Sequence, residues 1–206
     1  MKKIENWDNI EIKEFNENKK FTLGGKKCKI VNVKNFIYNG IEKISLELDI
    51  IDGENIGYFQ KKYDERNNSN KFWDDGATIS FVADPTEEKD KSYIKGLIKA
   101  IESYNHNYKW NWDEQSLKDK FINVNFSLKE YEGTDGNIYT KPQVYRYVNT
   151  KENFKEDYIP SVRTKNNGYI KYEEYIKNLE NKNSTNNSNS FKEFTDLVEI
   201  TDNLLD

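Results

Sequence analysis

Cysteine and histidine are almost absent from this sequence. Its 206 residues include one cysteine, Cys28, and one histidine, His106. One cysteine cannot form an internal disulfide, which favours a reducing compartment. A zinc site needs several His or Cys ligands, so one chain cannot build one from these residues. A catalytic triad would have to use His106, and no serine stands in a nucleophile-elbow motif. The sequence therefore predicts no catalytic residue.

Long apolar runs and nucleotide-binding motifs are also lacking. No segment approaches the ~20 apolar residues of a membrane-spanning helix, and the charged N-terminus has no apolar core of a signal peptide. Neither a Walker loop nor a G-x-G-x-x-G motif occurs. Acidic pairs such as Asp74-Asp75 and Glu87-Glu88 could hold Mg²⁺, as in a metal-dependent nuclease, but such pairs are usually solvated surface. We expect no cofactor, no metal, no membrane association and no enzymatic activity.

Charge and aromatic content favour a folded chain with a separate tail. Charged residues make up 33% of the sequence, yet 14% of it is aromatic, and disordered chains are poor in aromatics. Of the net charge of −4, the segment 181–206 carries −3, because it has two lysines and five carboxylates. The remaining body is nearly neutral. This balance argues against a polycation that coats duplex DNA, but it allows a local basic groove.

The stretch 92–120 contains the clearest helix in the first two thirds of the chain. Ile94, Leu97, Ile98 and Ile101 follow the spacing of one buried helical face. Asp90 or Ser92 could cap its start, and the Asn-His-Asn run after Tyr104 is expected to end it. Trp110 and Trp112 follow, and we expect them to close the bottom of a barrel.

Strand-like segments surround this helix. Strands are predicted over 26–37, 41–51, 57–63, 121–131 and 138–148, with hairpin turns at Asn39-Gly40 and 134–137. The run Thr78–Ala83 could be a strand or a connection. Three strands, a helix and two strands is the order of an OB-fold, a five-stranded Greek-key barrel, although other small α+β meanders read the same way.

These elements predict a mainly β, OB-fold-like barrel with one helix between strands three and four. The expected organisation is an N-terminal arm over 1–20, the barrel domain over 21–165, a short helical extension over 166–180, and a flexible linker with an acidic and hydrophobic tail over 181–206.

Aromatic and basic residues are interleaved along the predicted strands and in one loop. Surfaces of this kind bind single-stranded nucleic acid, since rings stack on bases and cations follow the phosphates. The alternative is that these rings fill the barrel. The predicted binding residues are Tyr58, Phe59, Lys61, Lys62, Tyr63, Phe72, Trp73, Lys129, Tyr131, Tyr139, Lys141, Tyr145, Arg146 and Tyr147.

The C-terminal segment resembles the tails with which bacterial single-stranded-DNA-binding proteins recruit repair and replication proteins. A polar linker leads to a short acidic and apolar tip, which offers apolar anchors to a recombinase, a helicase or another replication protein. The predicted partner-binding residues are Phe191, Phe194, Asp196, Leu197, Ile200, Leu204 and Leu205. A frayed tail is the alternative.

Several motifs together resemble a family of phage and prophage proteins from low-GC Gram-positive bacteria. They are Gly25–Cys28 (GKKC), Leu46–Asp52 (LELDIID), Gly57–Tyr63 (GYFQKKY), Lys95–Ile98, Ile101–Ser103, Tyr108–Asp113 (YKWNWD), Glu130-Tyr131 and Asp135–Asn137. The family is the DUF669-like group, which is similar to phage single-stranded-DNA-binding proteins. The resemblance spans about residues 23–165, and it implies an OB-fold and cofactor-free DNA binding in phage replication or recombination.

The sequence thus predicts a single-stranded-DNA-binding protein of the host bacterial cytoplasm, with a homodimer as one possible state. The second hypothesis is a phage-encoded inhibitor that mimics DNA or plugs the cleft of a host defence nuclease. Negative net charge and the absence of catalytic groups are equally compatible with it.

Overall fold

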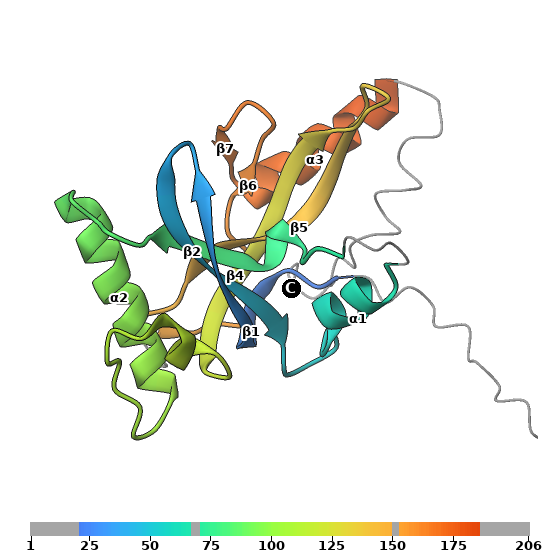
Figure 1. Cartoon of the computed structure of the whole chain (residues 1–206). Coiled ribbons are helices and arrows are strands. Elements are labelled where there is room, and N and C mark those ends of the chain that lie inside the picture. The colour runs from blue at the N-terminus through green and yellow to red at the C-terminus, as the bar shows by residue number, and fades with distance from the viewer. Residues whose placement is uncertain (1–20, 67–70, 150–152, 186–206) are drawn as a thin grey trace, which may run out of the picture.

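The computed structural model describes residues 21–66, 71–149 and 153–185 (Figure 1). Within these residues the chain is mainly β, with seven strands in one mixed open sheet and three α-helices. The strands are β1 (Gly24–Tyr38), β2 (Ile41–Ile50), β3 (Thr78–Val82), β4 (Phe121–Glu132), β5 (Ile138–Tyr147), β6 (Val162–Arg163) and β7 (Tyr169–Ile170). The helices are α1 (Tyr58–Asp64), α2 (Glu88–Tyr104) and α3 (Tyr172–Thr185), and short 3₁₀ turns lie at η2 (Asp75–Ala77) and η3 (Glu114–Leu117).

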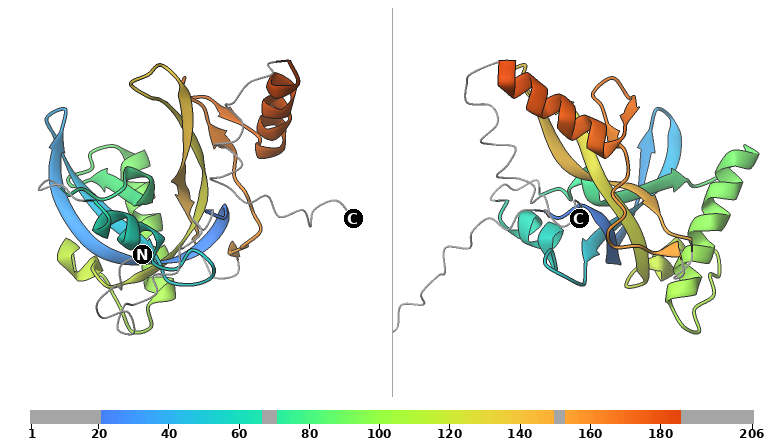
Figure 2. Two further views of the ribbon diagram at one scale, coloured as in Figure 1. Left: turned by 90° about the vertical axis from the view of Figure 1, so that its right-hand side faces the viewer. Right: turned by 180° about the vertical axis from the view of Figure 1, so that it is seen from behind.

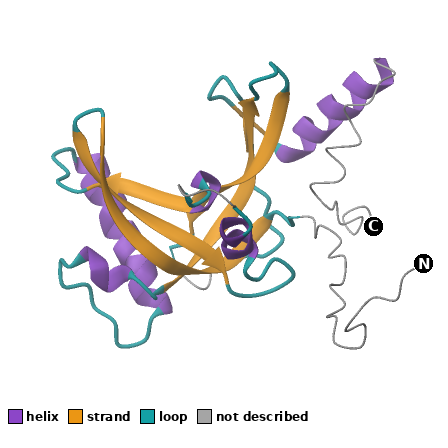
Figure 3. Cartoon of the chain, turned by 45° about the vertical axis from the view of Figure 1, so that its right-hand side comes forward, coloured by secondary structure: helices purple, strands orange, loops and turns teal. Residues whose placement is uncertain are grey.

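β1 is the strand that joins the two halves of the sheet. It pairs antiparallel with β2 on one edge and with the first half of β4 on the other. β3 extends the sheet beyond β2, and β5 pairs with the other edge of β4. The sheet curls strongly, and the β1–β2 and β4–β5 hairpins rise from it on opposite sides (Figures 2 and 3).

The expectation of a closed barrel is wrong, because the described sheet stays open between β3 and β5. The 3₁₀ turn η2 lies at this position instead. A Cβ on Gly76 would stand 2.1 Å from the carbonyl oxygen of Pro142 in β5, so only glycine fits this approach. Pro142 has no N–H to donate to a neighbouring strand, which explains why no ladder forms beside it.

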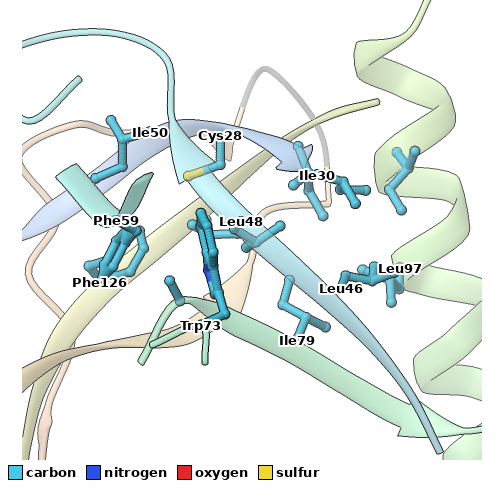
Figure 4. Packing of buried hydrophobic residues seen from close by; sticks show 14 of the residues in the cluster. Cys28, Ile30, Leu46, Leu48, Ile50, Phe59, Trp73, Ile79, Leu97 and Phe126 are labelled. Carbon is cyan, nitrogen blue, oxygen red and sulfur yellow. The ribbon is translucent and has the colours of Figure 1, made fainter. Parts of the chain in front are cut away.

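The core lies against the curled sheet and includes side chains of both α2 and α1. Ile30 of β1, Leu46 of β2 and Ile122 of β4 are buried, and Leu97 of α2 packs from the other side (Figure 4). Burying such side chains stabilises the fold by roughly 1.5–3 kcal/mol each. The four apolar positions predicted for this helix are all buried, and the helix lies between β3 and β4 as predicted.

The C-terminal end of α2 was predicted correctly and its N-terminal end was not. The helix starts earlier than predicted, with Glu87 rather than Asp90 or Ser92 at its N-cap. It ends at the predicted place, where Asn105 donates hydrogen bonds from Nδ2 to the carbonyl oxygens of Ile101 (2.7 Å) and Phe121 (2.8 Å). The Asn105 side chain thereby joins the helix end to the start of β4.

The predicted third strand over 57–63 is instead helix α1, and β3 is the run Thr78–Val82. Gly57 has a φ of 69°, which turns the chain out of the extended conformation. Asp49 in β2 then accepts hydrogen bonds from the backbone N–H groups of Phe59 (3.1 Å) and Gln60 (3.3 Å). A carboxylate at these N–H groups stabilises the first turn of a helix.

The two tryptophans after α2 do not close the bottom of the sheet as expected. Trp112 is 82% exposed, and Trp110 is only partly buried beside it, with ring centroids 4.6 Å apart. Leu117 of η3, which is fully buried, fills the core at this position. Leu117 therefore shares with Trp110 the packing that was expected of the two tryptophans.

The chain beyond β5 adds to the sheet before the predicted helix begins. β6 pairs in parallel with β4 at Lys129 and Arg163, and β7 pairs with β6. Helix α3 follows, and its buried Tyr175 donates a hydrogen bond to Oε1 of Glu130 (3.0 Å). The predicted arm over 1–20 and the tail contacts from 191 onward lie outside the described residues. Among the helices that are described, none is long and apolar enough to cross a membrane.

Asp49 gives the fold a testable pH dependence. Burial raises the pKa of Asp49, although its backbone hydrogen bonds oppose this shift. The folded chain therefore keeps the proton to a higher pH than the unfolded chain, whose aspartates titrate near about 3.9. The free energy of unfolding then loses a contribution as pH rises from that value through the raised pKa of the folded state. Asp49→Asn, whose side-chain oxygen can still accept both hydrogen bonds, should lack this contribution.

The measurement is urea denaturation of both proteins across the acid range. The stability of the wild type relative to Asp49→Asn should decrease as pH rises. Asp52→Asn is the control of opposite sign, because the hydrogen bond from Lys27 lowers the pKa of Asp52. Parallel stability curves for the wild type and Asp49→Asn would contradict the assignment.

Candidate nucleic-acid interface

The two long hairpins carry most of the exposed aromatic and aliphatic side chains of the sheet. In the β1–β2 hairpin, residues 34–42 are all exposed, and the turn is made by Asn39 and Gly40, both with positive φ. The β4–β5 hairpin turns at Gly133–Asn137 and is exposed around its tip. We call the exposed side chains near these two turns the hairpin surface; it comprises Phe36, Ile37, Tyr38, Ile41, Tyr131, Ile138 and the half-buried Tyr139.

The β4–β5 side of the hairpin surface is an aromatic pair beside a cation. The rings of Tyr131 and Tyr139 stack with centroids 5.8 Å apart and planes inclined by 29°. The Nζ of Lys141 lies 5.7 Å from the centroid of the Tyr131 ring. Tyr139 also donates a hydrogen bond to Oδ2 of Asp135 (2.6 Å), which is the main reason that the pKa of Asp135 is lowered. Sequence reasoning predicted these tyrosines and Lys141, and Lys129 pairs with Lys141 across the hairpin.

The β1–β2 side was missed from the sequence. Ile37 is 77% exposed, and Phe36, Tyr38 and Ile41 are exposed beside it. The Nζ of Lys43 lies 5.0 Å from the Tyr38 ring centroid. A usable signal was present in the sequence: Phe36, Ile37 and Tyr38 are three consecutive aromatic or apolar residues directly before the Asn-Gly turn, so alternation cannot direct all three into the core.

The predicted residues of α1 and the loop after it divide between core and surface. Phe59 and Trp73 are buried in the core, so the expectation that they offer exposed stacking faces is not met (Figure 4). Phe59 stacks on Phe126 at 5.5 Å between ring centroids. Phe72 is 58% exposed.

The other α1 residues do not complete an aromatic platform. Tyr58 and Tyr63 are half-buried against the core, while Lys61 is exposed and Lys62 is half-buried. The Nζ of Lys62 is 5.0 Å from the Tyr58 ring centroid. This division was not predicted, because the sequence pattern indicated a strand over 57–63, in which alternate residues would share a face.

Tyr145, Arg146 and Tyr147 lie at the end of β5 remote from its hairpin turn. Tyr147 donates a hydrogen bond to the carbonyl oxygen of Tyr93 in α2 (3.0 Å), and Tyr145 contacts Tyr169 edge to face at 5.8 Å. A bulge at Tyr145 separates this part of β5 from the tip. The structure therefore does not bring these three residues together with Tyr131 and Tyr139.

Carboxylates neutralise several of the predicted cations. Lys141 forms an ion pair with Asp75, and Lys62 one with Asp74 at 3.6 Å. Burial opposes ionisation of Asp75, but the hydrogen bond and charge of Lys141 outweigh it, so the pKa of Asp75 is lowered. On the β1–β2 hairpin, Lys34 pairs with the buried Glu47 at 2.5 Å. The hairpin surface thus offers rings with partly compensated cations.

The acidic pair Asp74-Asp75 has structural roles. Asp74 Oδ1 accepts a hydrogen bond from the backbone N–H of Gly76 (2.9 Å) and caps η2. Within the described residues, no group of three or more His, Cys, Asp or Glu side chains could hold a metal ion. Cys28 is fully buried, and burial raises the pKa of its thiol, which keeps it protonated and unreactive.

Comparison with known proteins adds no relative. No protein-family model matches the chain, and no curated protein matches it significantly. The resemblance to the DUF669-like group therefore stays a prediction.

Replacing the neighbouring residues Phe72 and Trp73 in turn tests whether the first ring lies on the surface and the second in the core. Trp73→Ala should reduce the free energy of unfolding by about 3–5 kcal/mol, because it empties a core position that is only 8% exposed. Phe72→Ala should change it by less than about 0.5 kcal/mol. Urea denaturation measures both, and equal losses would show that the two rings are not divided in this way.

Proposed function

We propose that this protein binds single-stranded DNA through the hairpin surface. The observation that carries the proposal is the pair of exposed aromatic sites, each with a lysine beside it, on two hairpins of one curled sheet (Figure 3). Bases stack on such rings with roughly 1–3 kcal/mol each, and every base offers a face for this contact. Binding is therefore largely independent of sequence and needs no cofactor.

The strand pairing supports an OB-fold-like classification under this proposal. β1 pairs with β2 and β4, β3 joins β2, β5 joins β4, and the helix stands between β3 and β4. An OB-fold uses the same succession of elements, and its binding loops include the connections between strands one and two and between strands four and five. Those two connections are the hairpin turns described above.

The ion pairs indicate how the binding energy is divided. Each lysine that contacts a phosphate of single-stranded DNA steepens the slope of log affinity against log salt concentration by about 0.7. Lys141 and Lys34 already have carboxylate partners, so fewer phosphate contacts are available than the lysine content suggests. We therefore expect stacking to contribute more than charge, and the affinity to decrease only moderately with salt.

The biological setting rests on the sequence resemblance. In a phage or prophage, such a protein would protect single strands during replication or recombination in the host cytoplasm. The tail residues from Phe191 to Leu205 would recruit a recombinase, a helicase or another replication protein. These residues lie outside the part of the chain that the structure describes.

Replacing the hairpin tyrosines tests the proposal. Tyr38→Ala and the double variant Tyr131→Ala/Tyr139→Ala should each weaken binding to labelled oligo-dT, by about 1–3 kcal/mol for every stacked base lost. The measurement is fluorescence anisotropy at low and high salt. Trp112→Ala is the control, because this exposed ring belongs to neither hairpin and should leave the affinity unchanged.

Two results would contradict the proposal. The wild type could fail to bind oligo-dT at low salt, or the hairpin variants could bind as tightly as Trp112→Ala. Circular dichroism of every variant verifies that the fold is retained.

One observation favours a protein-binding inhibitor as the second candidate. The β1–β2 tip carries exposed apolar side chains, with Ile37 77% and Ile41 48% exposed, and apolar anchors of this kind suit a protein partner. A stoichiometric host nuclease recovered from a nuclease-treated lysate, together with no affinity for oligonucleotide, would support this function instead.

A further inference from the structure

A second surface feature lies at the end of β5 remote from the hairpin tip. It is a pocket of about 620 Å³ between β4, β5, the first turns of α2 and the segment 153–158. The size falls in the range of small-molecule sites. The lining residues that matter here are Tyr93, Asn125, Arg146, Tyr147, Lys155 and Tyr158.

Asn125 is the first sign that the pocket takes a ligand. It lies in the middle of β4, where it pairs with Gly25 of β1 and with Arg146 of β5, and only 4% of it is exposed. Its Oδ1 is buried and has no hydrogen-bond partner among the described residues. Buried side-chain oxygens are nearly always paired in folded proteins, so an unpaired amide in a pocket wall calls for a polar ligand group.

The aromatic walls supply the second element of a site. The hydroxyl of Tyr147 is fixed by its hydrogen bond to the Tyr93 carbonyl oxygen, and the two rings meet at 5.3 Å between centroids. A Cβ on Gly96 would stand 2.6 Å from the Tyr147 hydroxyl oxygen, so glycine in α2 leaves room for this ring. Tyr158 faces the pocket from the opposite segment. These rings can bind the flat face of a nucleobase.

Two cations at the pocket supply the third element. Arg146 is exposed, and its guanidinium carbon lies 5.4 Å from the Tyr158 ring centroid. Lys155 lines the same pocket, whereas the nearby carboxylate of Glu156 lies 3.9 Å from Lys27 Nζ on β1. Arginine binds phosphate through paired N–H groups, and lysine binds it as a point charge.

We propose that this pocket binds a nucleoside monophosphate unit, with its base between the tyrosine rings and its edge hydrogen-bonded to Asn125. Its phosphate contacts Arg146 and Lys155. The unit is either a free mononucleotide or one residue of a DNA strand; the second source rests on the proposed function. The amide, the rings and the cations select a base and a phosphate together, which neither a nucleoside nor a phosphate ion satisfies alone.

The first experiment titrates the full chain with dAMP, dCMP, dGMP and dTMP, and separately with the matching deoxynucleosides and inorganic phosphate, by isothermal calorimetry. At least one mononucleotide should bind about tenfold more tightly than either fragment. Arg146→Ala should weaken that binding about tenfold, which corresponds to the loss of one charged contact. Lys99→Ala removes an exposed cation from α2 outside the pocket and should leave the affinity unchanged.

Asn125→Leu removes the amide and should also weaken binding, but it could disturb the buried ladder. The exposed Arg146→Ala variant keeps the test decisive if Asn125→Leu does not fold. The proposal is overturned if no mononucleotide binds more tightly than phosphate, or if Arg146→Ala and Lys99→Ala bind the mononucleotide equally well.

A second titration, with oligo-dT, separates the two sources and the two proposals. If the unit belongs to a strand, Arg146→Ala should weaken oligonucleotide binding in addition to the effect of the hairpin variants. If Arg146→Ala changes mononucleotide binding only, the pocket takes free nucleotides. Hairpin-dependent oligonucleotide binding without mononucleotide binding would overturn the pocket and leave the proposed function standing. Mononucleotide binding without oligonucleotide binding would overturn the proposed function and leave the pocket proposal standing.

Discussion

The pairing of β1 with two partners is the constraint on which the rest of the structure depends. This strand of 15 residues pairs with β4 over Gly24–Lys29 only, whereas its pairing with β2 continues to Tyr38. Between the two regions the register shifts by one residue after Ile30. The chain around η3 covers the vacated edge, since Ile30 exchanges backbone hydrogen bonds with Asp119 and Lys120, both at 2.8 Å. A bulge of this kind bends a strand and increases its twist.

This bend separates a buried half of β1 from an exposed half. Cys28 and Ile30 are completely buried, while the residues beyond Val33 extend past the core. The curl of the sheet places the β4–β5 hairpin across from the β1–β2 hairpin (Figure 2). Aromatic side chains at these two turns find no core to enter, so they remain available for contact with another molecule. The structure thus relates an irregularity in one strand to the surface on which the proposed function depends.

Local pattern was enough to predict much of this fold from the sequence. β1, β2, β4 and β5 follow from period-two alternation and turn residues, and α2 follows from its four buried positions. Contacts between distant segments decided the rest. Helix α1 depends on Asp49 from β2, and the open edge depends on Pro142 meeting Gly76. Neither pair can be recognised from spacing along the chain.

The same distinction applies to the candidate site. The tyrosine pair of the β4–β5 hairpin was predictable because cross-strand partners follow from the turn. Burial of Trp73 was not, since its loop carries no periodic signal, and the division of β5 into two surfaces depends on a bulge. Charge was the least predictable property. Pairs such as Lys141 with Asp75 join residues that are 66 positions apart and neutralise cations that the sequence presents as free.

Photocrosslinking of a single-stranded oligonucleotide that carries 5-iodouracil tests the central claim most directly. After ultraviolet irradiation, proteolysis and mass spectrometry identify the side chains that touch the bases. The account predicts crosslinks at Tyr38 on one hairpin and at Tyr131 or Tyr139 on the other. Crosslinks confined to α1 and Phe72, with none on either hairpin, would contradict it.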